Sequence, residues 1–112
     1  MILDVGEKVY IIERRYFPED PRRHFIGKVI KCTGNTIRVK GYAWVFDAVK
    51  GSFVKKPEER ERVIQLGERL IAMVIPAQVN LSELKYEATE KGLIVTDGKK
   101  FSLDISEFKT MR

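Results

Sequence analysis

Two pairs of arginines flank a short segment that contains two prolines. The basic residues are Arg14, Arg15, Arg22, Arg23 and the adjacent His24. Guanidinium groups bind phosphate and carboxylate oxygens through paired hydrogen bonds, so four of them together would hold an anion. Pro18 and Pro21 favour a loop that brings both pairs to one end of a sheet. The pattern predicts an anion site, although Glu19 and Asp20 could neutralise it and leave only solvated surface.

A second cluster lies in residues 36–46, where side-chain types alternate with the period of a β-strand. If this strand is unbroken, its apolar residues face the core, and the residues that alternate with them share the opposite face. These residues are Arg38, Lys40, Tyr42, Trp44 and Phe46. Basic groups beside aromatic rings form a platform on which unpaired bases stack.

Gly41 lies in the middle of this strand and leaves a different interpretation open. Glycine can host a β-bulge, and one bulge reverses the facing of every residue that follows it. The three rings of Tyr42, Trp44 and Phe46 would then enter the core, whereas exposed they would form a large apolar patch for a monomer. We therefore favour a bulge at Gly41, and expect Arg38 and Lys40 to face solvent in both cases.

Catalytic and metal-binding constellations are scarce. The chain has one histidine, His24, and one cysteine, Cys32, which excludes an internal disulfide and a cysteine-rich zinc site. The two lie in one expected strand, roughly 26 Å apart at full extension, so they cannot act as a nucleophile–base pair there. No glycine-rich phosphate loop or nucleophile elbow occurs. We expect no enzyme activity, no metal and no cofactor, with Cys32 an inert buried thiol.

Positive charge is concentrated in the first half of the chain. The 112 residues include 21 Lys+Arg and 16 Asp+Glu, which gives a net charge of +5. Residues 1–56 hold 12 basic and 6 acidic side chains, and residues 57–112 hold 9 and 10. Such an excess attracts nucleic acid or an acidic protein surface. Few Asn and Gln beside many charged residues is the direction seen in thermophile proteins.

The length fits one compact domain, residues 1–112, with a basic β-rich half (1–56) and a neutral α+β half (57–112). Strand patterns near residues 9–11, 25–32 and 36–46, joined by one long and one tight loop, resemble the start of a small SH3-like or OB-like barrel. The longest apolar run, residues 70–75, is far short of the roughly 20 residues that cross a bilayer. We therefore expect a cytoplasmic protein with no membrane partner.

The sequence of residues 57–112 predicts helix as well as sheet. Residues 57–66 fit a helix that begins at Pro57 or a strand, and we favour the helix by a narrow margin. The apolar run 70–75 is typical of a buried central strand. Asn80 and Glu83 form a capping box, and Gly92 offers a left-handed end, so a firm helix is expected at about 81–91.

The last residues predict a β-hairpin. Leu93 and Val95 share one face of its first strand. A three-residue loop, 96–98, would place Leu93 opposite Phe101 and keep the apolar residues of both strands together. The expected class is therefore α+β, mostly antiparallel sheet with one firm helix.

Two classes of function remain. The first is weak, largely electrostatic binding of nucleic acid, RNA or single strands, through the basic half. The alternative is a protein-interaction or homo-oligomeric module, in which strand edges and aromatic surface are covered by another subunit.

Overall fold

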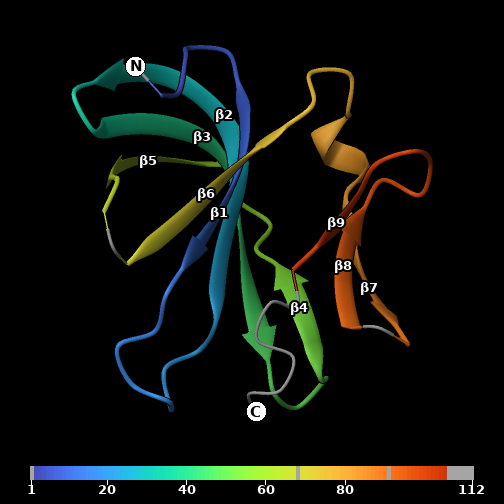
Figure 1. The fold of residues 1–112 in the computed structure, drawn as a ribbon. Helices are drawn as coiled ribbons and strands as arrows, with labels where there is room; N and C mark the ends of the chain where they lie inside the picture. Colours follow the sequence, from blue (N-terminus) through green and yellow to red (C-terminus); the bar gives the residue numbers. More distant parts are fainter. Residues whose placement is uncertain (1, 68, 91, 106–112) are drawn as a thin grey trace. The chain divides into compact units, whose positions relative to one another are not determined.

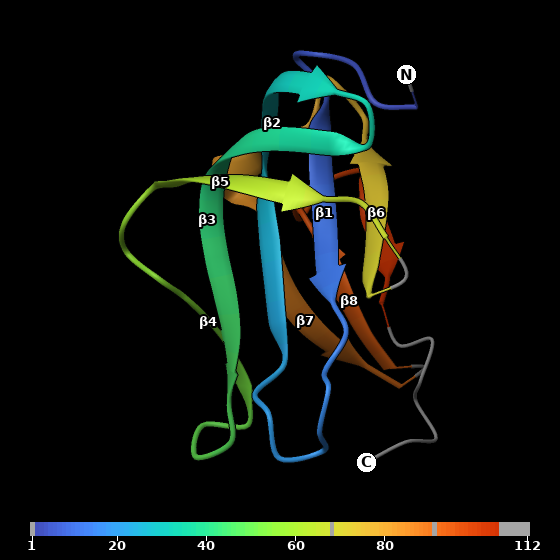
Figure 2. The ribbon, with the colours of Figure 1, turned by 90° about the vertical axis from the view of Figure 1, so that its left-hand side faces the viewer.

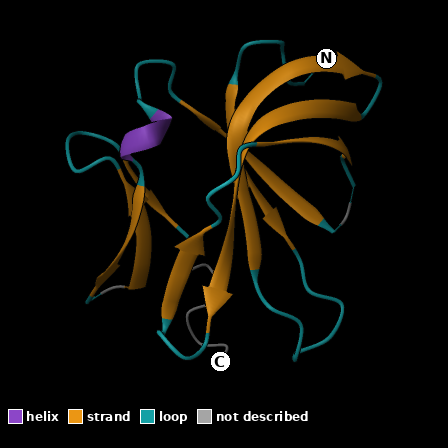
Figure 3. Cartoon of the chain, turned by 180° about the vertical axis from the view of Figure 1, so that it is seen from behind, coloured by secondary structure: helices purple, strands orange, loops and turns teal. Residues whose placement is uncertain are grey.

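The chain is built almost entirely of β-strands. The computed structural model describes residues 2–67, 69–90 and 92–105, which form two compact units, Met1–Ala77 (unit 1) and Gln78–Arg112 (unit 2) (Figure 1). Within these ranges the helical content is one short 3-10 helix, η1 (Leu81–Glu83) (Figure 3). No helix in the described parts of the chain is long and apolar enough to cross a membrane.

Unit 1 is a single antiparallel sheet. Its strands are β1 (Lys8–Glu13), β2 (Arg23–Thr33), β3 (Thr36–Asp47), β4 (Ser52–Lys55), β5 (Arg60–Gln65) and β6 (Leu70–Ile75). The order is β4-β3-β2-β1-β6, and β5 also pairs with β3 (Figure 2). Since no described residue pairs β5 with β6, the sheet stays open. The expected closed SH3-like or OB-like barrel is therefore wrong.

One face of this sheet carries the hydrophobic core of unit 1. Alternate positions along a strand point to the same face, and residues directly opposite each other on neighbouring strands do too. The buried core residues are Leu3, Val9, Ile11, Phe25, Val29, Ile37, Val39 and Ala43. Cys32 packs against them half-buried, with its thiol 3.5 Å from the carbonyl oxygen of Leu3.

The bulge expected at Gly41 is wrong. The β2–β3 pairing runs without a break through Gly27 and Gly41, which lie opposite each other, and its register shifts instead between Val29 and Lys31. A methyl group on Gly41 would overlap the backbone of Ile26 and Gly27. Glycine is needed here because the two paired backbones approach each other closely, which gives the same sequence signal as a bulge.

Both expected helices are wrong as well. The segment 57–66 contains strand β5, which pairs with the first part of β3 from Thr36 to Gly41. Asn80 does cap a helical turn, because its side-chain oxygen accepts from the amide of Ser82 at 3.0 Å. That turn ends at Leu84, whose backbone is extended.

Residues 85–89 then form a strand rather than the rest of the expected helix. Unit 2 is a three-stranded antiparallel sheet of β7 (Lys85–Thr89), β8 (Gly92–Thr96) and β9 (Ser102–Asp104). The pairing of β7 with β8 satisfies the backbone groups that a helix at 81–91 would have bonded internally. The expected α+β class is therefore replaced by a nearly all-β fold.

The hairpin of β8 and β9 is present, but with a different register. Val95 lies opposite Leu103, and the amide of Ile105 donates to the carbonyl of Leu93, so the expected pairing of Leu93 with Phe101 is wrong. The loop is longer than three residues. An Asp97 carboxylate oxygen accepts from the amides of Lys99 and Phe101, at 2.8 and 3.2 Å, which closes the longer turn.

The apolar strand β6 also differs from expectation. It pairs with β1 along Leu70–Ile75 and ends the strand order, so it is an edge strand rather than a buried central one. A continuous apolar run indicates that both faces are covered, but it does not indicate that both edges are paired.

The close approach of the backbones at Gly27 and Gly41 gives a stability prediction. Gly41→Ala should lower the free energy of unfolding by about 2 kcal/mol or more, because the added methyl group meets backbone rather than a side chain that can move. Gly67→Ala is the control, since a methyl group there meets nothing within 4 Å and should change stability by about 0.5 kcal/mol or less. Urea unfolding measures both variants. Equal stabilities of the Gly41→Ala and Gly67→Ala variants would contradict the close approach of the two backbones.

Candidate nucleic-acid interface

The face of unit 1 opposite the core carries a row of basic and aromatic side chains. Because β3 is unbroken, its alternate residues Arg38, Lys40, Tyr42, Trp44 and Phe46 share this face. Neighbouring strands extend the row, since Lys28 lies opposite Lys40 and Lys31 lies opposite Arg38. On the other side, Lys55 of β4 lies opposite Trp44 and Phe53 lies opposite Phe46. With Arg22, these residues are called the basic–aromatic face below.

Cationic groups lie directly over the aromatic rings of this face. The Lys55 ammonium is 4.1 Å from the centroid of the Tyr42 ring and 6.0 Å from that of Trp44. The Arg22 guanidinium lies 4.7 Å from the Phe46 ring and 5.2 Å from the Phe53 ring. Attraction between a cation and an aromatic ring holds both in place. The rings of Tyr42, Trp44 and Phe46 are half-buried and Phe53 is buried.

The other end of the basic–aromatic face is purely basic. Lys28, Lys31, Arg38 and Lys40 are all exposed, and none of them belongs to an ion pair formed by the described residues. The nearest acidic position in the sheet register is Glu61, opposite Lys40 on β5. This end of the face therefore presents four exposed positive charges beside the half-buried rings.

His24 lies opposite Trp44 and belongs to the aromatic end of the same face. It is buried, its Nδ1 is 2.6 Å from the Tyr10 hydroxyl, and its ring stacks on Phe53 with centroids 4.4 Å apart. Burial, and secondarily the charge of Arg22, lowers the pKa of His24 to about 3. The imidazole is therefore neutral at pH 7 and adds no positive charge to an anion site.

The loop between β1 and β2 separates the four arginines that were expected to converge. Arg15 folds back on its own loop and donates to the carbonyl of Pro18 at 2.8 Å. Arg23 lies opposite Glu13 and Val45, on the core side of the sheet. Arg22 reaches the basic–aromatic face.

Arg14 is exposed and starts the same loop. Its amide donates to the carbonyl of Arg69 at 2.8 Å, and the Arg69 guanidinium lies 3.8 Å from the centroid of the exposed Tyr16 ring. These contacts tie the start of the loop to the segment before β6. The structure thus gives the arginines four different surroundings, and only Arg22 joins the candidate interface.

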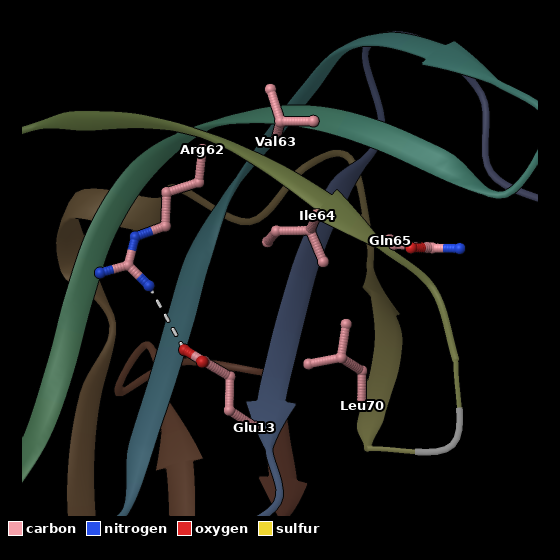
Figure 4. A pocket seen from close by; sticks show the side chains of 6 residues that line it. All are labelled: Glu13, Arg62, Val63, Ile64, Gln65 and Leu70. Atoms are coloured by element: carbon pink, nitrogen blue, oxygen red, sulfur yellow. Dashed lines mark hydrogen bonds and ion pairs between the residues drawn. The ribbon is translucent and has the colours of Figure 1, made fainter.

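A shallow groove opens on the core side of the sheet, between β5 and β6. Its volume is about 360 Å³, and its lining residues are Glu13, Arg62, Val63, Ile64, Gln65 and Leu70 (Figure 4). Arg62 and Glu13 form an ion pair across it at 3.3 Å. The pair neutralises both charges, and the groove brings together no nucleophile and base. No group of three metal-ligating side chains occurs in the described parts of the chain.

Comparison of the chain with models of known families, with curated proteins and with solved structures finds no significant match. The candidate interface therefore rests on its own geometry.

Sequence reasoning missed three basic residues of the candidate interface. Lys28 and Lys31 lie on the same side as Arg38 and Lys40 because the irregularity in β2 falls between Val29 and Lys31. Lys55 joins the face only through the pairing of β4 with the second half of β3. The alternation of Lys28 with its apolar neighbours was a usable signal, whereas the positions of Lys31 and Lys55 required the register.

The buried neutral His24 predicts acid sensitivity. A pKa lowered by folding means that the unfolded chain binds more protons below about pH 6.5, so stability falls as pH decreases from there toward 3. At most about 1.4 kcal/mol is lost per pH unit, or about 2 kcal/mol between pH 6.5 and 5. Urea unfolding at both pH values measures the loss, and His24→Gln should flatten it. An unchanged slope in that variant would contradict the assignment.

Proposed function

We propose that unit 1 binds single-stranded nucleic acid, RNA or DNA, on the basic–aromatic face. The observation that carries the proposal is the unbroken course of β3, which presents Arg38 and Lys40 on the same face as Tyr42, Trp44 and Phe46. Phosphates would contact the exposed lysines and Arg38, and bases would stack at the half-buried rings. The net charge of +5 adds a long-range attraction to any polyanion.

Single strands suit this face better than a duplex. Stacking on an aromatic ring requires an unpaired base, and it contributes roughly 1–3 kcal/mol per base without selecting a sequence. Sheet faces that combine aromatic side chains with basic groups bind single strands in this way. Lys55 and Arg22 lie over the ring faces, so a base that stacks there would displace the cation, which would then be close enough to pair with a neighbouring phosphate.

The alternative class, a protein-interaction or homo-oligomeric module, remains a prediction. It is supported by the open edge of β6, a different part of the sheet from the basic–aromatic face.

Removal of charge from the face should weaken binding in a salt-dependent way. We expect Arg38→Ala/Lys40→Ala to reduce affinity for a labelled single-stranded oligonucleotide and to lower the slope of log affinity against log salt by about 1.4, or roughly 0.7 per lost phosphate contact. Both side chains are exposed, so the fold should be retained. Fluorescence anisotropy at several salt concentrations measures affinity and slope.

Lys85→Ala/Lys100→Ala is the matched control, because it removes the same charge from exposed positions in unit 2. It should leave the slope nearly unchanged. If both double variants lose affinity equally, the attraction belongs to the net charge of the chain and not to the basic–aromatic face.

A further inference from the structure

The sheet of unit 1 has open edges, and the edge strand β6 contains neither a charged residue nor a proline. Edge strands in proteins are commonly protected by charged residues, by proline or by being very short. Among the described edge strands, β4, β5, β7 and β9 each contain at least one charged residue. β6 is six residues long, contains only apolar residues, and exposes 52% of Val74.

The register of β6 shows which of its backbone groups point away from β1. The amide of Arg14 donates to the carbonyl of Arg69, so these two residues form a hydrogen-bonded antiparallel pair just beyond the strands. Hydrogen-bonded pairs alternate along such a ladder, which assigns Ile71, Met73 and Ile75 to bonds with β1. The backbone groups of Ala72 and Val74, and the carbonyl of Leu70, therefore point to the open edge.

These outward groups match an identical strand that runs in the opposite direction. In an antiparallel pair related by a two-fold axis at Ala72, the residue faces its own copy and forms two hydrogen bonds. The amide of each Val74 donates to the carbonyl of the other Leu70, which adds two more. The Leu70 amide already donates to Gly67 at 3.1 Å and is not needed.

Side chains fit the same register. Leu70 would face Val74 on one side of the combined sheet, and Ile71 would face Met73 on the other, so every contact is apolar. The smallest side chain of the strand, Ala72, lies at the axis. Pro76, which has no amide hydrogen, follows the strand and limits the pairing to its length.

We infer that β6 is a self-association edge, at which two copies of the chain join their sheets through antiparallel β6–β6 pairing centred on Ala72. A second copy is the favoured occupant because an uncharged strand meets no like charge in its own image, and because the register then has no unpaired residue between Leu70 and Val74. Five paired residues bury less than a standard stable interface of about 1,600 Å². The dimer should therefore dissociate on dilution.

Sedimentation equilibrium of the full chain over a wide concentration range tests the inference. The expected result is a monomer–dimer equilibrium whose dimer fraction rises with concentration and falls strongly for Val74→Lys. The matched control is Val63→Lys, at a 65% exposed valine on the edge strand β5, which should dimerise like the unchanged protein. A protein that stays monomeric at high concentration, or an equal effect of the two substitutions, would overturn the inference.

A cross-link tests the register independently of any effect on folding. In a Cys32→Ser background, Ala72→Cys should form a covalent dimer on mild oxidation, because paired Cα atoms about 5.5 Å apart lie within the range that a disulfide spans. Val63→Cys in the same background should remain largely monomeric. A cross-link that forms equally at position 63, or is absent at position 72, would contradict pairing centred on Ala72.

Discussion

The close approach of the paired strands β2 and β3 at Gly27 and Gly41 is the constraint on which the arrangement of unit 1 depends. The two glycines lie opposite each other, and a side chain on either would overlap the backbone of the other strand. The edge of β3 that faces away from β2 pairs with two different strands. Thr36–Gly41 pair with β5, and Trp44–Asp47 pair with β4. The close approach at the two glycines lets β3 pair first with β5 and then with β4 while its side chains keep alternating between the two faces of the sheet.

Because the alternation is kept, the two faces of the sheet acquire different chemistry. Val39 and Ala43 enter the hydrophobic core, while Lys40, Tyr42 and Trp44 lie on the other side. The rings on that side are held by cations above them and by the neutral, buried His24, which stacks on Phe53. A charged imidazole at that position would be costly, and its pKa near 3 reflects this burial. The basic–aromatic face is thus positively charged, with its rings in contact with Lys55, Arg22 and His24.

The sequence predicted the strand at 36–46, because period-two alternation is a strong local signal, but the bulge favoured at Gly41 assigned Tyr42, Trp44 and Phe46 to the wrong face. The sequence did not distinguish a bulge at Gly41 from a close approach of two backbones. Both require glycine, and only the position of the partner strand shows which of the two is present. The helix expected at 81–91 had a real cap at Asn80, but a local signal governs one turn, and pairing with β8 determines the rest. The positions of Lys31 and Lys55, and the edge location of β6, depend on register and strand order, which no local pattern carries.

Trp44 offers the most direct measurement, because it is the only tryptophan and lies in the aromatic part of the basic–aromatic face. Its fluorescence should be recorded at low salt while a single-stranded oligonucleotide is added, with binding followed in parallel by anisotropy of a label on the oligonucleotide. If bases stack on this face, the Trp44 emission is quenched with the same midpoint as the anisotropy change and recovers on addition of salt. Oligonucleotide binding that leaves the Trp44 emission unchanged, or no binding at low salt, would contradict the account.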